Sequence, residues 1–204
     1  MRIGGRYSVR NPTSVTSEER MSSLKPMPHL SVDDYLEGEK TSPLRHEYID
    51  GQVYAMAGAS ARHIGIALNL ATRLRPHLRG GPCRVFMSDM KARIEALDLF
   101  YYPDVIVSCD PQDRAEYFRS RPCLIVEVMS PSTEAIDRRE KLHAYQTLDS
   151  LREYVLLAQD EVKAHVYRRD DDGNWWVQTL TEADELRMES VDLNIPLLDL
   201  YEEI

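Results

Sequence analysis

Two short apolar runs near the middle of the chain dominate its hydrophobic pattern, and each is associated with one acidic residue. Residues 105–107 (Val-Ile-Val) directly follow Asp104, and the run over 124–129 contains Glu127. Runs this short, and this rich in β-branched residues, predict central strands that are buried on both faces. A carboxylate within such a strand is costly unless it is paired or bound to a cation. The two acids therefore suggest a metal site.

The pattern before these runs predicts a helix, a β-hairpin and a second helix. Ser31 precedes an acidic segment and is a suitable N-cap for a short helix. Residues 46–58 alternate around an Asp-Gly turn, which predicts a hairpin with Glu47 on its first strand. Apolar residues between 61 and 78 recur at helical spacing, and His63 falls in the first turn of that helix.

The pattern after Glu127 predicts one more helix, over residues 134–148. Asp137, Lys141 and Tyr145 are each four residues apart, so they share one face of this helix. The remaining segments predict strands, a hairpin over 162–180, and a final strand with a short closing helix. These strands cover residues 83–95, 154–158, 162–168, 175–180 and part of the tail.

The composition is that of a soluble globular protein. The chain has 204 residues, with 43% hydrophobic and 29% charged content, which suits a single domain. We expect that domain over 29–204 and a flexible extension over 1–28, where no apolar period is found. No apolar run approaches the roughly 20 residues that span a bilayer, and an apolar secretory segment is lacking. A cytoplasmic protein with no membrane partner is expected.

Cysteine usage and net charge each limit the kinds of binding site that we expect. The three cysteines, at positions 83, 109 and 123, are unevenly spaced, which argues against a disulfide framework or a zinc knuckle. Cys109 and Cys123 lie at predicted strand positions, and we interpret them as small hydrophobic residues. The net charge of −9 argues against nucleic-acid binding through a basic surface. A bound divalent cation would locally reverse that sign.

Several short motifs together resemble a known family. They are PD at 103–104, EVMSPST at 127–133, and D-x-x-x-K at 137–141 followed by Tyr145. In this order and spacing they resemble the Uma-two family of putative restriction endonucleases, within the PD-(D/E)XK nuclease superfamily. HEYIDGQVYAMAG at 46–58 and His63 are similar to its N-terminal region. The resemblance covers about residues 29–204.

The resemblance implies both a fold and an activity. The fold would be α/β (α+β), with a central mixed β-sheet flanked by helices. This restriction-endonuclease-like core would carry an extra N-terminal hairpin and an extra C-terminal hairpin. The activity would be cleavage of DNA phosphodiester bonds that depends on Mg²⁺ or Mn²⁺. The acids predicted from the strands fit such an ion, because carboxylates with few soft ligands nearby select hard cations.

The resemblance also assigns roles to individual residues. Asp104 and Glu127 would correspond to the metal-binding acids of the superfamily motif. Val128 would offer its backbone carbonyl as a further ligand, and Glu47 would be the additional acid from the N-terminal region.

The lysine of the superfamily motif is displaced in this chain. Met129 stands two residues beyond the second acid, where the lysine is expected, and methionine cannot act as a cation or a proton donor. Lys141 on the following helix matches the relocated lysine of the family. It would orient the attacking water or stabilise developing negative charge. An ion pair with Asp137 is the structural alternative for Lys141.

The sequence also allows two other functions. Met129 and the acidic charge favour a catalytically weak or inactive nuclease-fold module that binds nucleic acid or a protein partner. A metal-dependent hydrolase of a smaller substrate, such as a nucleotide, is the second alternative. For His63 and Asp89 we favour structural interpretations, as a helix-start residue and a strand-bend residue, over a role in the site.

The Trp175–Trp176 pair bears on the expected partners. Only one of two adjacent strand residues faces the core. The other could stack on bases or cover a dimer contact, and we favour a homodimer, since cutting both strands of DNA often needs two sites.

Overall fold

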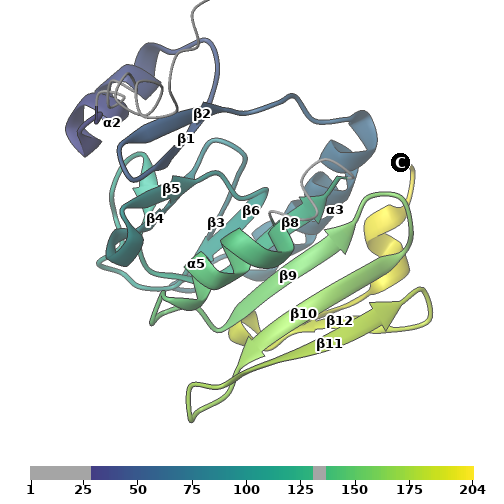
Figure 1. The fold of residues 1–204 in the computed structure, drawn as a ribbon. Coiled ribbons are helices and arrows are strands. Elements are labelled where there is room, and N and C mark those ends of the chain that lie inside the picture. The colour runs from purple at the N-terminus through teal and green to yellow at the C-terminus, as the bar shows by residue number, and fades with distance from the viewer. Residues whose placement is uncertain (1–28, 131–136) are drawn as a thin grey trace, which may run out of the picture.

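Two mixed β-sheets and three α-helices form most of the part of the chain that the computed structural model describes, residues 29–130 and 137–204 (Figure 1). The predicted N-terminal extension over 1–28 lies outside these residues. So does the start of the helix predicted over 134–148. The mixed α/β class expected from the sequence is confirmed, but the β-strands divide between two main sheets instead of one.

The larger sheet has six strands in the order β11-β10-β9-β8-β6-β3. Its central strands β8 and β9 run parallel, and its other neighbours are antiparallel. Every residue of β6 is buried, as the β-branched runs predicted. The strands are β3 (Arg84–Met87), β6 (Val105–Ser108), β8 (Pro122–Met129), β9 (Glu153–Ala158), β10 (Lys163–Arg169) and β11 (Trp175–Thr181).

The second sheet has five strands in the order β2-β1-β5-β4-β7. The predicted N-terminal hairpin forms β1 and β2, and β1 pairs with β5. The segment 83–95 divides between the two sheets because Ser88, with a φ of 51°, turns the chain between β3 and β4. The strands are β1 (His46–Ile49), β2 (Gln52–Ala55), β4 (Lys91–Ile94), β5 (Leu99–Tyr101) and β7 (Phe118–Arg119).

The first two predicted helices are present, and each has a serine as its N-cap. Ser31 caps α2 (Val32–Thr41), and Ser60 caps α3 (Ala61–His77). A π-helical turn, η2 (Asp137–Lys141), leads into α5 (Leu142–Gln146). Within the described residues, no helix is both long and apolar enough to cross a membrane.

The C-terminal region forms the edge of the large sheet and a small separate sheet. The hairpin predicted over 162–180 is β10–β11, so it belongs to the six-stranded sheet. The tail forms β12 (Glu185–Met188) and β13 (Leu193–Pro196), followed by the 3₁₀-helix η4 (Leu197–Tyr201). Trp175 packs on the core while Trp176 is exposed, as expected for adjacent strand residues.

Helices cover the two faces of the large sheet, with α5 in front of it and α3 behind it in Figure 1. Successive side chains of a strand point to opposite faces. Along β8, Leu124, Val126 and Val128 pack in the cluster that contains the buried face of α3. Ile125 and Met129 pack in the cluster that contains α5. Glu127 has the same parity as these two residues, so the strand directs it toward the α5 side.

A disulfide between Cys83 and Cys109 corrects the interpretation of the cysteines as unpaired packing residues. In the antiparallel pairing of β3 with β6, Arg84 lies opposite Ser108. The next residues outward are the two cysteines, which the pairing brings face to face. Cys123 is a free thiol, and burial raises its pKa to about 11. The sequence separation of 26 residues gave no local signal for this bond.

Candidate active site

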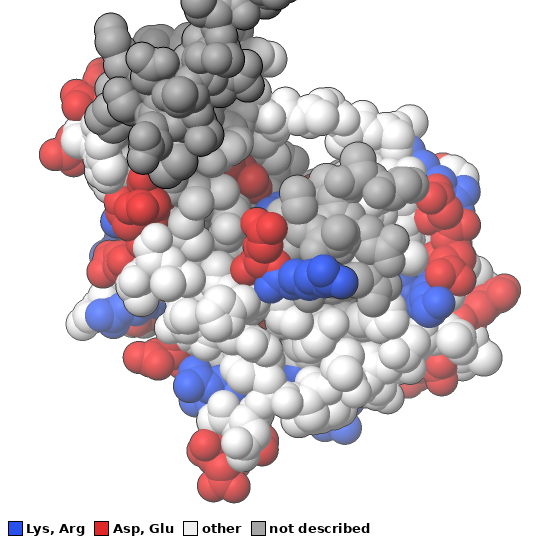
Figure 2. Space-filling model, viewed as in Figure 1, with Lys and Arg blue, Asp and Glu red and all other residues white. Residues whose placement is uncertain are grey.

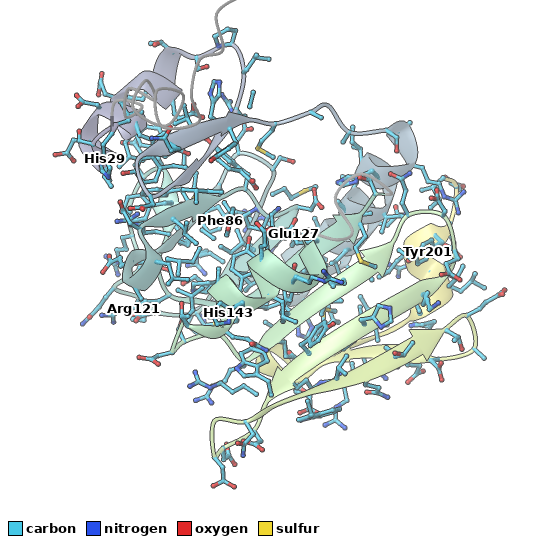
Figure 3. All side chains as sticks on the ribbon, viewed as in Figure 1. His29, Phe86, Arg121, Glu127, His143 and Tyr201 are labelled. Carbon is cyan, nitrogen blue, oxygen red and sulfur yellow. A yellow bond between two sulfur atoms is a disulfide. The ribbon has the colours of Figure 1, made fainter. Side chains whose placement is uncertain are left out.

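A pocket of about 490 Å³ contains all the side chains predicted to form the site. It lies where the N-terminal hairpin, the start of α3, the β6 and β8 strands and the Lys141 turn meet. Glu127 is one of its lining residues and lies near the centre of the molecule in the view of Figure 3. The polar and charged lining residues are Glu47, Tyr54, Ser60, His63, Tyr102, Asp104, Glu127, Ser130, Lys141 and Gln159.

Strand pairing brings the first two acids to the same place. In the antiparallel pairing of β6 with β8, Val105 lies opposite Val126. Asp104, just before β6, therefore lies beside the segment that carries Glu127. Its Oδ2 atom accepts a hydrogen bond of 2.7 Å from the Val128 backbone N–H. This bond fixes the Asp104 carboxylate against the main chain of β8.

Lys141 reaches the acids from the helix that follows β8. Its Nζ atom lies 3.3 Å from Glu127 Oε1 and 3.1 Å from Glu47 Oε1. One turn later, the Tyr145 hydroxyl donates to Glu127 Oε1 at 3.1 Å. The spacing of four residues predicted this shared face. Met129, in the strand position where the superfamily has its lysine, is buried in the core.

His63 also lines the pocket, although the sequence favoured a structural role for it. Its Nε2 atom lies 2.7 Å from Asp104 Oδ1, and both side chains are largely buried. The Ser60 cap, whose Oγ accepts from the His63 backbone N–H at 3.1 Å, fixes the start of α3 and so places the imidazole. The sequence showed a histidine in the first turn of a capped helix, but not which strand that turn would face.

Two tyrosines beside the acids remain protonated at neutral pH. Burial, assisted by the Glu47 charge, raises the pKa of Tyr101 to about 12. Burial and the neighbouring Glu127 raise the pKa of Tyr145 well above its usual value. Tyr145 therefore acts as a hydrogen-bond donor to Glu127 and not as a base. The Lys141 ammonium lies over the Tyr101 ring, 5.5 Å from its centroid.

The donor set of the pocket suits a hard divalent cation. Three carboxylates and the strand backbone at Val128 offer oxygen atoms, which Mg²⁺ and Mn²⁺ prefer. The Lys141 ammonium, lying between two of the carboxylates, shows that this part of the pocket already holds positive charge. By chemistry, the residues fit the expected ion.

The three predicted acids, Glu47, Asp104 and Glu127, do not all place ligand oxygen atoms within 4.8 Å of one another. Among the described residues, only His29, Asp50 and Asp98 place three possible ligand atoms within 4.8 Å of one another. His29 of that group lies away from Glu127 in Figure 3. Asp98 there already accepts hydrogen bonds from Arg93 and Tyr48.

Comparison with known protein families agrees with the motifs. The Uma2 family, described as "Putative restriction endonuclease", matches residues 32–197. The chain belongs to the Uma2 family. The matched region contains the whole lining of the pocket, from Glu47 to Gln159.

Two curated relatives of this Uma2 chain come from Synechocystis sp. The protein slr1290 is 40% identical over 181 residues, which is 88% of this chain and 95% of the relative. The protein sll1609 is 30% identical over 154 residues, 74% of this chain and 87% of the relative. Both are named as uncharacterized proteins, so neither name assigns an activity.

A solved structure supports the fold of this Uma2 chain. The crystal structure of a "putative nuclease belonging to DUF820" from Anabaena variabilis superposes with a TM-score of 0.67. The match covers 84% of this chain and 97% of that chain, at 18% sequence identity. At this identity the likeness speaks for the fold alone.

The charged surface on one face of this Uma2 protein is mixed. On the face shown in Figure 2, the basic and acidic side chains of the described residues are interspersed, without a continuous basic patch. The distribution of charge on this face therefore does not by itself indicate where nucleic acid would bind.

Asp89, which we predicted to be a strand-bend residue, forms an ion pair with two hydrogen bonds to Arg45.

Proposed function

We propose that the chain is a divalent-metal-dependent endonuclease that hydrolyses DNA phosphodiester bonds. One observation carries the proposal. Lys141, the only lysine lining the described pocket, contacts both Glu127 and Glu47, and Asp104 lies in the same pocket. A relocated lysine that reaches the acids supplies the charge that Met129 cannot. Membership of a family described as restriction endonucleases supports the same activity.

In this proposal, Asp104 and Glu127 would hold Mg²⁺ or Mn²⁺, with Glu47 and the Val128 carbonyl as further oxygen donors. When bound, such an ion polarises a phosphoryl oxygen and lowers the pKa of a coordinated water. The Val128 N–H keeps the Asp104 carboxylate oriented toward the pocket. Fixed orientation matters because a displacement of about 1 Å in a catalytic group can cost about 100-fold in rate.

Lys141 would stabilise the negative charge that develops on the phosphoryl oxygens, or hold the attacking water by a hydrogen bond. Both roles need a buried, pre-oriented cation. Its side chain is 9% exposed, and its two carboxylate contacts hold Nζ in the pocket. We also propose that the active form is a homodimer, because cleavage of both DNA strands often needs two sites. Light scattering on the purified chain tests that assembly.

The test is cleavage of plasmid and single-stranded DNA by the full chain with Mg²⁺, Mn²⁺ or chelator. Glu127→Gln and Lys141→Met keep the size of the side chain but remove its charge. We expect each to lower the cleavage rate by about 100-fold or more, since loss of one preorganised charge-stabilising group costs about 10²–10³-fold.

Matched controls are Glu161→Gln and Lys163→Met, which remove the partners of an ion pair whose glutamate is well exposed. We expect both to cleave like the unaltered chain. Equal residual nicking in all variants would contradict the proposal.

The alternative is a nuclease-fold module without significant catalytic activity, and the burial of Met129 at the motif lysine position favours it. It predicts that no divalent metal supports cleavage. It also predicts DNA or protein binding that survives Glu127→Gln.

A further inference from the structure

His63 is the only imidazole among the described lining residues of the pocket, and it faces a predicted metal ligand directly. Its Nε2 atom is 2.7 Å from Asp104 Oδ1. The other oxygen of Asp104, Oδ2, is held by the Val128 N–H. The carboxylate thus presents one oxygen to the main chain and the other to the imidazole.

The distance of 2.7 Å between His63 Nε2 and Asp104 Oδ1 is close to the distance between two ligand atoms bound to one metal ion. Donor atoms at adjacent positions of an octahedral ion, with bonds of about 2.1 Å, lie about 3 Å apart. His63 Nε2 and Asp104 Oδ1 would have to separate by only a few tenths of an ångström. Both groups are fixed by local structure, through the Ser60 cap and the Val128 N–H.

A second histidine–acid pair in the molecule has a different environment. His46 Nδ1 lies 2.8 Å from Glu39 Oε1, but Glu39 also accepts from the Tyr102 hydroxyl and from the His46 backbone N–H. Glu39 and His46 do not appear among the lining residues of the pocket. A short histidine–carboxylate contact alone therefore does not distinguish a ligand pair, whereas its position in the acidic pocket does.

We propose that His63 is a nitrogen ligand of the active-site metal and makes Mn²⁺, not Mg²⁺, the preferred ion. The inference rests on the proposed function. Both ions take oxygen donors, but Mn²⁺, as a first-row transition-metal ion, accepts an imidazole nitrogen more readily than Mg²⁺ does. An oxygen set with one imidazole therefore shifts the preference toward Mn²⁺.

The test measures metal binding directly, in the full chain and without DNA. Mn²⁺ is titrated into the chelator-treated protein while free Mn²⁺ is followed by electron paramagnetic resonance, and Mg²⁺ is then added as a competitor. Pulsed measurements on bound Mn²⁺ report whether a nitrogen nucleus is coordinated. The variants are His63→Gln, His77→Gln and His29→Gln. His77 is a matched control on the same helix, where its Nε2 contacts the Val191 carbonyl at 2.9 Å.

We expect Mn²⁺ to bind at least about tenfold more tightly than Mg²⁺ and to show nitrogen coupling. His63→Gln should remove the coupling and lower Mn²⁺ affinity by about tenfold or more, since even loss of an outer-shell partner costs about 10–100-fold. His77→Gln and His29→Gln should leave both unchanged. The nitrogen coupling is read on the unaltered chain, so it remains informative even where a variant does not fold.

Three other results would overturn the proposal, and they have different meanings. Mn²⁺ binding without nitrogen coupling would leave His63 as a positioning residue for Asp104 and leave the proposed function intact. Coupling lost in His29→Gln but kept in His63→Gln would place the ion at the His29–Asp50–Asp98 group. Failure of the unaltered chain to bind either ion would remove the proposed metal-dependent function as well.

Discussion

Two buried glutamates on neighbouring parallel strands have different surroundings. Glu127 on β8 and Glu153 on β9 are 4% and 1% exposed. In the β8–β9 register, Glu153 lies opposite Leu124, whereas Glu127 lies opposite Leu156. Leu124 and Leu156 belong to different core clusters, so the two acids point to opposite faces of the sheet.

Their partners explain what each acid does. Glu153 accepts from Arg168 Nε at 3.0 Å, from the backbone N–H groups of Glu189 and Ser190, and from the Ser190 hydroxyl. These donors come from β10 and from the η3 turn (Glu189–Val191), so Glu153 fastens the C-terminal region to the sheet. Glu127 instead lines the pocket and shares Lys141 with Glu47. Burial of an acid therefore does not by itself indicate a functional site. Glu127 differs from Glu153 because its side chain also lines the pocket.

The largest expected effect on stability is at Glu153. Glu153→Gln leaves the buried Arg168 guanidinium without its charge partner, and breaking a buried pair in this way costs about 3–5 kcal/mol of unfolding free energy. Urea unfolding measures this loss. The exposed Glu161→Gln should change stability by about 1 kcal/mol or less. If Glu153→Gln abolished metal binding but not stability, the structural role of Glu153 would be wrong.

Glu39 tests whether a third buried acid behaves like Glu153. Burial alone raises the pKa of Glu39, but hydrogen bonds from Tyr102 and His46 outweigh it, so the pKa lies below its usual value. The ionised carboxylate therefore stabilises the fold above about pH 4.5. This contribution is lost as the pH falls through the lowered pKa.

We expect Glu39→Gln to destabilise the protein by about 1–3 kcal/mol at pH 7, because buried donors lose an ionised acceptor. Thermal unfolding from pH 7 to pH 3 should show this difference shrinking below about pH 4.5. A difference that stays constant over this range would contradict the assigned role.

Tyr145 tests how far the surroundings of Glu127 serve the pocket. Tyr145→Phe removes the hydrogen bond to Glu127 Oε1 and should cost about 0.5–1.5 kcal/mol of stability. Tyr201→Phe is a matched control, since the Tyr201 hydroxyl donates to the Ala158 and Lys163 carbonyls. Both variants should lose similar stability, but only Tyr145→Phe should reduce cleavage. Equal cleavage by the two variants would make Tyr145 purely structural.

The smallest expected effect on stability is at Glu127 itself. In Glu127→Gln, Lys141 keeps its contact with Glu47 at 3.1 Å, so its buried charge stays paired. We expect a change of about 1 kcal/mol or less, as is common where a site residue serves function more than stability. Urea unfolding beside Glu153→Gln makes the comparison direct. Destabilisation equal to that of Glu153→Gln would show that Glu127 is a structural acid.

Local sequence patterns predicted much of the candidate site. The apolar runs identified β6 and β8 with Asp104 and Glu127, and the spacing of four residues placed Lys141 and Tyr145 on one face. The Asp-Gly turn predicted the hairpin that carries Glu47. These signals depend on side-chain periodicity and turn chemistry, which are encoded within a few residues.

Contacts between distant segments were decided only by the tertiary structure. The division into two sheets, the Cys83–Cys109 bond and the approach of His63 to Asp104 each depend on strand pairing or helix packing across many residues. No local pattern specifies which strand a helix start will face, because that is fixed by burial of the whole helix on the sheet. The sequence by itself thus determined the acids and the lysine, and the fold decided that the histidine joins them.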